Sequence, residues 1–155
     1  MAASHKASPH MLLEEQLCFP LYAASRLFTR LYQPLLEPLG ITYPQYIVLL
    51  VLWQHGKQSV SEIGEKTFLE SNTLSPLLKK LETKKLVARS REQEDERAVR
   101  VSLTASGREL EKRARLVPEA LYARLQVPGN ELRMLRTLLN HFVGQLHTTL
   151  QEQKA

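Results

Sequence analysis

The chain has 155 residues, of which 43% are hydrophobic and 24% charged, so it is long enough to bury a core. The net charge of +5 favours polyanionic partners, and no run approaches the roughly 18 apolar residues that span a bilayer. Cys18 is the only cysteine, which excludes a disulfide within the chain, and residues 1–10 lack the apolar segment of a secretory signal. We therefore expect a cytoplasmic protein in which residues 1–10 form a disordered tail.

The first predicted helix covers residues 12 to about 36. We expect Pro34 and Pro38 to end it, and Pro20 to remove one backbone hydrogen bond and kink it. Cys18 would then lie inside the helix, where the helix dipole has little effect. The helix is predicted because apolar residues alternate at steps of four and three: Leu17, Leu21, Ala24, Phe28, Leu31 and Leu35.

Three shorter helices follow. Pro44 after Thr42, with Gly56 as the stop, predicts a short and almost wholly buried second helix. Ser59 and Glu62 form the spacing of a capping box, which opens a third helix ending near residue 68. The fourth helix follows a polar turn, and its predicted inner face has the spacing i, i+3, i+4, i+7: Leu74, Leu77, Leu78 and Leu81.

After residue 86 the apolar pattern changes to a period of two, which predicts a hairpin of residues 87–91 and 99–103. Residues 83–86 contain no glycine, so we expect a left-handed non-glycine residue there, at a cost on the order of 1 kcal/mol. Thr104 is predicted to cap a helix that runs to about Val117, where Pro118 interrupts it. A last helix shows another stripe at steps of three and four: Leu132, Leu135, Leu139, Phe142, Leu146 and Leu150.

This order predicts a mainly α fold with a small β-hairpin wing. Residues 41–104 would form a winged helix-turn-helix DNA-binding region, and residues 11–40 and 105–155 a helical dimerisation region, within one compact domain. Apolar stripes at both ends of the chain are what a two-fold helical dimer needs, although they could also pack within one subunit.

The fourth helix has the composition of a recognition helix. Such a helix needs small polar residues near its N-terminal end to approach base edges, and cations further along for phosphates. In the hairpin tip, Arg97 is suited to the minor groove, and Asp95 is placed to orient its guanidinium group. A solvated helix face and a charged turn are the alternative for these residues. The predicted recognition-helix residues are Ser71, Asn72, Thr73, Ser75, Pro76, Lys79 and Lys80.

The hairpin segment Asp95-Glu-Arg97-Ala-Val99-Arg-Val-Ser-Leu103-Thr104 resembles the wing of MarR-family regulators, in which an Asp-x-Arg run precedes a strand ending in Leu-Thr. The order of elements matches from about residue 12 to 150. A more specific similarity, to the organic-hydroperoxide-sensing OhrR repressors of the one-cysteine type, is carried by Gln16-Leu-Cys18-Phe, Leu21-Tyr22-Ala, Tyr32, Pro34-Leu-Leu and Thr42-Tyr-Pro-Gln-Tyr46.

The resemblance implies that Cys18 is a redox-sensing thiol. Peroxides are attacked by thiolate, and a hydrogen bond to the charged form of a thiol lowers its pKa, so tyrosine hydroxyls are suitable partners. Tyr22 lies one helical turn from Cys18, and the resemblance places the partner subunit's Tyr32 and the partner subunit's Tyr43 at the thiol. The apolar side chains around Cys18 suit an alkyl or lipid hydroperoxide.

The implied protein is a homodimeric repressor that binds a pseudo-palindromic operator in double-stranded DNA and leaves it when an organic hydroperoxide oxidises Cys18. Without a second cysteine, the oxidised thiol would be capped by a small-molecule thiol, cyclise with a backbone nitrogen, or overoxidise. We expect no cofactor, no metal site, no membrane partner and no enzyme activity.

Three alternatives remain at this point. The same fold could be a repressor released by a non-covalent phenolic ligand, with Cys18 a packing residue. A thiol peroxidase would need a resolving thiol and a base or arginine beside Cys18, and the sequence offers neither. A purely structural helical dimer would leave the wing residues without a role.

Overall fold

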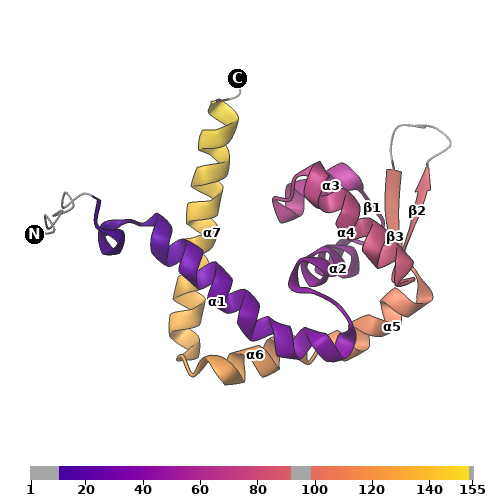
Figure 1. Cartoon of the computed structure of the whole chain (residues 1–155), viewed down its shortest axis with the longest axis horizontal. Helices are drawn as coiled ribbons and strands as arrows, with labels where there is room; N and C mark the ends of the chain where they lie inside the picture. Colours follow the sequence, from indigo (N-terminus) through magenta and orange to yellow (C-terminus); the bar gives the residue numbers. More distant parts are fainter. Residues whose placement is uncertain (1–10, 92–98, 154–155) are drawn as a thin grey trace, which may run out of the picture. The chain divides into compact units, whose positions relative to one another are not determined.

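A computed structural model describes residues 11–91 and 99–153 (Figure 1). The predicted disordered tail, residues 1–10, lies outside the described residues. The chain forms two compact units, residues 1–121 and residues 122–155. The elements run in the order η2 (Leu13–Glu15), α1 (Cys18–Leu36), η3 (Glu37–Leu39), α2 (Tyr43–His55), β1 (Gln58–Ser59), α3 (Val60–Thr67), α4 (Ser71–Thr83), β2 (Val87–Arg91), β3 (Val99–Leu103), α5 (Ala105–Ala114), α6 (Val117–Leu125) and α7 (Gly129–Glu152).

The start of α1 corrects the sequence prediction. Residues 13–15 form a separate 3₁₀ turn, and the α-helix begins at Cys18 rather than near residue 12. Pro20 therefore lies in the first turn, where a missing N–H costs no helical hydrogen bond, instead of kinking the helix. Pro34, which was expected to end the helix, lies inside it, two residues before its last residue.

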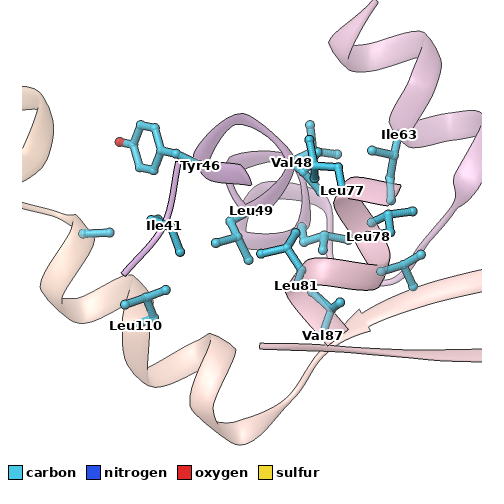
Figure 2. Close-up of a cluster of buried hydrophobic side chains, with 14 of the residues drawn as sticks. Ile41, Tyr46, Val48, Leu49, Ile63, Leu77, Leu78, Leu81, Val87 and Leu110 are labelled. Carbon is cyan, nitrogen blue, oxygen red and sulfur yellow. The ribbon is translucent and has the colours of Figure 1, made fainter. Parts of the chain in front are cut away.

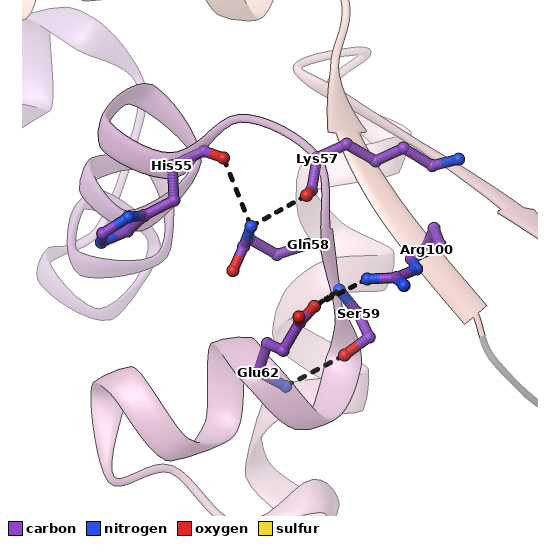
Figure 3. Close-up of polar contacts among 6 residues, drawn as sticks. All are labelled: His55, Lys57, Gln58, Ser59, Glu62 and Arg100. Carbon is purple, nitrogen blue, oxygen red and sulfur yellow. Dashed lines mark hydrogen bonds and ion pairs between the residues drawn. The ribbon is translucent and has the colours of Figure 1, made fainter.

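Local signals place the next helices. At the start of α2, the N–H of Thr42 donates to Oε1 of Gln45 at 3.1 Å. At the start of α3, the N–H of Glu62 donates to Oγ of Ser59 at 3.1 Å, and the N–H of Ser59 donates to Oε2 of Glu62 at 2.6 Å (Figure 3). Both are the reciprocal contacts of a capping box, as predicted for Ser59.

The wing is a three-stranded antiparallel sheet of order β1-β3-β2. Val87 pairs with Leu103 and Arg91 with Val99, so the predicted hairpin has the expected strands. The two-residue strand β1, which pairs Gln58 with Val101, was not predicted, because two residues give no periodic signal.

The core lies inside the first unit, between α2, α3, α4, the sheet and α5 (Figure 2). Leu74, Leu78 and Leu81 of α4 are at most 1% exposed, which confirms the predicted inner face. Other members shown in Figure 2 include Ile41, Tyr46, Val48, Leu49, Ile63, Leu77, Val87 and Leu110.

The turn after α4 is held against the start of α5. Lys85 has φ 57°, which confirms the expected left-handed residue without glycine. The Thr104 hydroxyl donates to the carbonyl oxygen of Lys85 at 2.6 Å and accepts the N–H of Gly107 at 3.1 Å. A Cβ on Gly107 would lie 2.1 Å from the carbonyl oxygen of Leu86, so this approach requires glycine.

The helix predicted from residue 105 to about 117 ends earlier, at Ala114, and α6 begins at Val117 with Pro118 in its first turn. In the second unit, α7 carries a row of exposed large apolar side chains: Met134, Leu135, Leu138, Leu139, Val143, Leu146 and Leu150.

Among the described residues, no single helix is long and apolar enough to cross a membrane. The segments Cys18–Leu39 and Tyr43–His55 meet that criterion only as a pair, bent by 72°, on length and composition alone.

Candidate functional site

The outer face of α4 is exposed, polar and basic. All seven residues predicted for the recognition helix are exposed, while the leucines between them are buried. The helix therefore presents small polar groups near its start and the ammonium groups of Lys79 and Lys80 further along. Asp95 and Arg97, the predicted wing residues, lie outside the described residues.

Two ion pairs fix the wing strands to the helix-turn-helix. Nη1 of Arg100 on β3 lies 2.8 Å from Oε2 of Glu62 at the start of α3 (Figure 3). Nη2 of Arg89 on β2 lies 2.6 Å from Oε2 of Glu82 near the end of α4. Each strand of the hairpin is thus tied to one of the two helices that form the helix-turn-helix.

These contacts hold both carboxylates in their charged form. The backbone N–H of Ser59, then its hydroxyl group, and then the charge of Arg100 lower the pKa of Glu62. Hydrogen bonds from the Arg89 side chain lower the pKa of Glu82. Hydrogen bonds to a carboxylate favour the ionised form, so both pairs persist well below neutral pH.

The thiol lies at the exposed start of α1. Cys18 is the first residue of the helix, whereas the sequence predicted a position further inside it, and its side chain is exposed. Leu17, Phe19 and Tyr22 are also exposed, at 65%, 40% and 60%, so large apolar side chains close to Cys18 in the sequence are open to solvent.

Of the three predicted tyrosines, only Tyr22 neighbours Cys18 within one chain. It lies four residues further along α1, on the same face, and its ring is contacted by the guanidinium carbon of Arg26 at 5.6 Å. Tyr32 is fourteen residues from Cys18 on the same helix, or about 21 Å at the α-helical rise. Tyr32 of the same chain is therefore out of reach of Cys18.

Tyr32 and Tyr43 meet each other instead. Their ring centroids are 4.7 Å apart, and Tyr32 also contacts the rings of Tyr46 at 5.7 Å and Phe28 at 5.3 Å. Sequence analysis missed Tyr46 and Phe28, although their helical spacing to Tyr43 and Tyr32 was a usable signal.

Tyr43 and Tyr46 remain neutral phenols near physiological pH. Burial raises the pKa of Tyr43. Burial and, second, the charge of ionised Tyr43 raise the pKa of Tyr46. A phenol that keeps its proton can donate a hydrogen bond to an anion.

Among residues 11–91 and 99–153, no group of three or more His, Cys, Asp or Glu side chains could hold a metal ion. An open cavity of about 490 Å³ lies between α2, α5 and the start of α6, lined by Tyr46, Leu50, Trp53, Gln54, Glu111, Ala114, Arg115 and Pro118.

Helix, turn, helix and a β wing, with a polar and basic outer face on α4, define a winged helix-turn-helix transcriptional regulator. The family model of the transcriptional regulators SarA/Rot matches residues 30–113. The organic hydroperoxide resistance transcriptional regulator of Bacillus subtilis is 45% identical over 138 residues, which cover 89% of this chain and 94% of that protein.

Solved structures agree. Reduced AbfR bound to DNA has 39% sequence identity and a TM-score of 0.71, covering 86% of this chain and 93% of that one. Disulfide-formed AbfR has 39% identity and a TM-score of 0.60, covering 84% and 92%. AbfR is a Staphylococcus epidermidis protein. The chain belongs to the MarR family of winged-helix transcriptional regulators, in the branch of the organic hydroperoxide regulators.

Proposed function

We propose that this regulator is a homodimeric repressor whose operator binding is switched off when an organic hydroperoxide oxidises Cys18. The observation that carries the proposal is the placement of the thiol. Cys18 is exposed at the start of α1, and the ring pair Tyr32–Tyr43 is too far along the same chain to reach it. A second copy can supply that pair, as the family resemblance implies.

A second copy also accounts for the exposed helix α7. The second unit consists of α7 and the end of α6, too little structure to bury seven large apolar side chains by itself. A two-fold dimer would cover this row and place two copies of α4 about 34 Å apart, as successive major grooves require. The operator would then be pseudo-palindromic double-stranded DNA, and we place the protein with that DNA in the cytoplasm.

Within this dimer, each part of the DNA interface has a role. Ser71, Asn72, Thr73, Ser75 and Pro76 would face base edges, where small side chains allow close approach. Lys79 and Lys80 would contact phosphates. We assign Arg97 to the minor groove and Asp95 to orienting its guanidinium group, as the sequence predicts.

The chemistry at sulfur is a two-electron oxidation. The Cys18 thiolate attacks one peroxide oxygen, so an S–O bond forms and the O–O bond breaks. The alkoxide that leaves takes a proton and becomes an alcohol, and the sulfur becomes a sulfenic acid. A small-molecule thiol can then displace water to form a mixed disulfide. A disulfide-formed state of the relative AbfR supports disulfide chemistry, and in this chain, with its single cysteine, the second sulfur would come from outside the chain.

Loss of the thiolate removes the acceptor of the tyrosine hydroxyl groups. A bulky adduct at a subunit interface would also separate Cys18 from the partner's Tyr32 and the partner's Tyr43. A small rotation of each DNA-binding region is sufficient to lose the groove spacing.

One experiment tests the proposal. A DNA duplex selected by the reduced wild-type protein is titrated with wild type and with Cys18→Ser, before and after treatment with cumene hydroperoxide. We expect wild type to lose affinity on treatment and Cys18→Ser to retain it. Equal release of both proteins would rule out the thiol as the sensor, and catalytic consumption of peroxide with added thiol would identify a peroxidase instead.

One observation favours a second candidate, a repressor released by a phenolic ligand. The cavity between α2 and α5 is lined by aromatic and apolar groups together with Arg115, which is paired with Glu111 at 3.1 Å. Release of Cys18→Ser from the duplex by salicylate, without any peroxide, would support this candidate.

A further inference from the structure

The linker between α1 and α2, residues 37–42, is contacted by cations from two other elements. Nη2 of Arg113 on α5 donates to the carbonyl oxygen of Pro38 at 2.9 Å. Nζ of Lys84, the residue directly after α4, donates to the carbonyl oxygen of Gly40. This linker joins the helix that carries Tyr32 to the helix that begins with Tyr43.

Lys84 makes a second contact, with the first turn of α2. Its Nζ donates to Oε1 of Gln45 at 3.1 Å. The same oxygen accepts the N–H of Thr42 at 3.1 Å, and Gln45 is only 3% exposed. One buried amide oxygen therefore connects Lys84, at the end of α4, to the capping box of α2, whose first residue is Tyr43.

At its other end, the contact between Lys84 and Gln45 leads to α4, the proposed DNA-binding helix. The backbone N–H of Lys84 donates to the carbonyl oxygen of Lys80 at 3.1 Å, so Lys84 continues the last turn of α4. Lys85 is held in the left-handed region, and its carbonyl oxygen accepts the Thr104 hydroxyl. Hydrogen bonds therefore hold the backbone before and after Lys84. We expect the Lys84 side chain to move with the end of α4.

We propose that Lys84 is a positioning residue that couples the state of Cys18 to the DNA affinity of α4, through Gln45 and the first turn of α2. The inference rests on the proposed function, in which Tyr43 donates to the partner's thiolate. While that bond exists, the first turn of α2 is fixed and Lys84 holds the end of α4 in its DNA-binding position. Oxidation removes the bond at Tyr43, and the linker and α4 move together.

Coupling of this kind is reciprocal. If the reduced thiol raises DNA affinity, DNA must stabilise the reduced, thiolate-bound arrangement by the same factor. Removing the Lys84 contact should weaken both effects together. If the Lys84 contact only stabilised the fold, its removal would change neither the effect of the thiol on DNA affinity nor the effect of DNA on the thiol.

The test compares four proteins: wild type, Lys84→Gln, Lys84→Arg and Lys85→Gln. Lys85→Gln is the matched control, because it removes the same charge from the adjacent exposed residue and keeps a left-handed backbone that glutamine tolerates as lysine does. For each protein, the Kd for the selected duplex is measured before and after cumene hydroperoxide, and the ratio of the two values reports the coupling.

We expect Lys84→Gln to lower this ratio at least fivefold relative to wild type, within the usual range of allosteric coupling. Lys85→Gln should keep the wild-type ratio, although its affinity in the reduced state should fall about as much as that of Lys84→Gln. Lys84→Arg should have the wild-type ratio. Equal ratios for Lys84→Gln and Lys85→Gln would overturn the inference. A wild-type ratio of one would instead contradict the proposed function.

A second measurement does not depend on oxidation. The rate of Cys18 alkylation by iodoacetamide is followed against pH, with and without the duplex. In wild type the duplex should move the half-maximal pH downward, and in Lys84→Gln this displacement should be largely lost. A displacement as large as that of wild type would contradict the coupling role. Lys84 is exposed, so its loss leaves the core intact, which thermal unfolding verifies.

Discussion

The carboxylate of Glu62 accepts two hydrogen bonds from different elements: the N–H of Ser59 at 2.6 Å and Nη1 of Arg100 at 2.8 Å. One side chain therefore caps α3 and also ties the wing strand β3 to the helix-turn-helix (Figure 3). Both contacts are strongest when this carboxylate is ionised.

The first prediction concerns pH. Because the pKa of folded Glu62 lies below its ordinary value of 4.5, ionised Glu62 stabilises the fold above that value. The contribution is lost as pH falls through the folded pKa. Glu62→Gln should be less stable than wild type near pH 7, and the difference should shrink at about pH 3.5. Urea unfolding at both pH values measures it, with Glu65→Gln, an exposed carboxylate on the same helix, as control. A difference independent of pH would contradict this role.

The second prediction concerns the contact between α5 and the turn after α4. Gly107→Ala would place a Cβ 2.1 Å from the carbonyl oxygen of Leu86, so the backbone must move. We expect a loss of about 3 kcal/mol or more in the free energy of unfolding. The adjacent exposed residue provides the control, because Ser106→Ala should change it by less than about 0.5 kcal/mol. Equal stability of the two variants in denaturant titrations would show that residue 107 and the carbonyl oxygen of Leu86 are not in tight contact.

Much of this fold could be predicted because its signals are local. The capping box at Ser59, the left-handed residue in the turn after α4 and the inner face of α4 each follow from residues within one or two helical turns. The same locality explains the error at Cys18. The apolar stripe continues through Leu17, so periodicity alone extended α1 too far, although Pro20 was a valid signal of a helix start.

The contacts that connect elements could not be predicted. Lys84 and Gln45 are 39 residues apart, and no local pattern or motif links the two positions. Arg113 reaches Pro38 across 75 residues. A long polar side chain bonds to whichever groups lie close to it in the fold, and this depends on how the core packs. The tyrosine pair follows from family resemblance. Helical spacing could have added Phe28 beside Tyr32 and Tyr46 beside Tyr43, but the contact between Tyr32 and Tyr46 depends on the packing of α1 on α2.

The third prediction concerns phosphate contacts. Lys79→Gln should weaken binding to all DNA sequences by a similar factor and reduce the slope of log K against log salt by about 0.9. Lys112→Gln removes the same charge from α5, where Lys112 is paired with Glu109 at 2.6 Å, and should leave the slope unchanged. Titration of the duplex at several salt concentrations measures both. An unchanged slope for Lys79→Gln would place this ammonium group away from the phosphates.

The fourth prediction concerns the wing. Arg97→Ala should weaken DNA binding and leave the peroxide reactivity of Cys18 intact, because the wing acts only on DNA in the proposed mechanism. Anisotropy titrations and the rate of sulfenic acid formation measure the two effects separately. Wild-type affinity in Arg97→Ala would show that the wing does not touch the duplex.

The last prediction tests whether one subunit completes the thiol site of the other. In a homodimer, Tyr43→Phe should slow Cys18 alkylation near neutral pH, because a hydroxyl donor to the thiolate is lost. Tyr122→Phe, which removes an exposed hydroxyl from α6, should have no effect. A mixed dimer of Cys18→Ser with Tyr43→Phe, isolated with two affinity tags, contains one thiol, on the chain that lacks Tyr43.

The partner in that mixed dimer has an intact Tyr43. If the hydroxyl group acts across the interface, the remaining thiol should react at the wild-type rate, since its donor comes from the Cys18→Ser chain. If Tyr43 acted within its own chain, the mixed dimer would be as slow as the Tyr43→Phe homodimer. The distance of about 21 Å between Cys18 and Tyr32 along α1 supports the first outcome, because Tyr43 contacts Tyr32 and shares its remoteness from the sulfur.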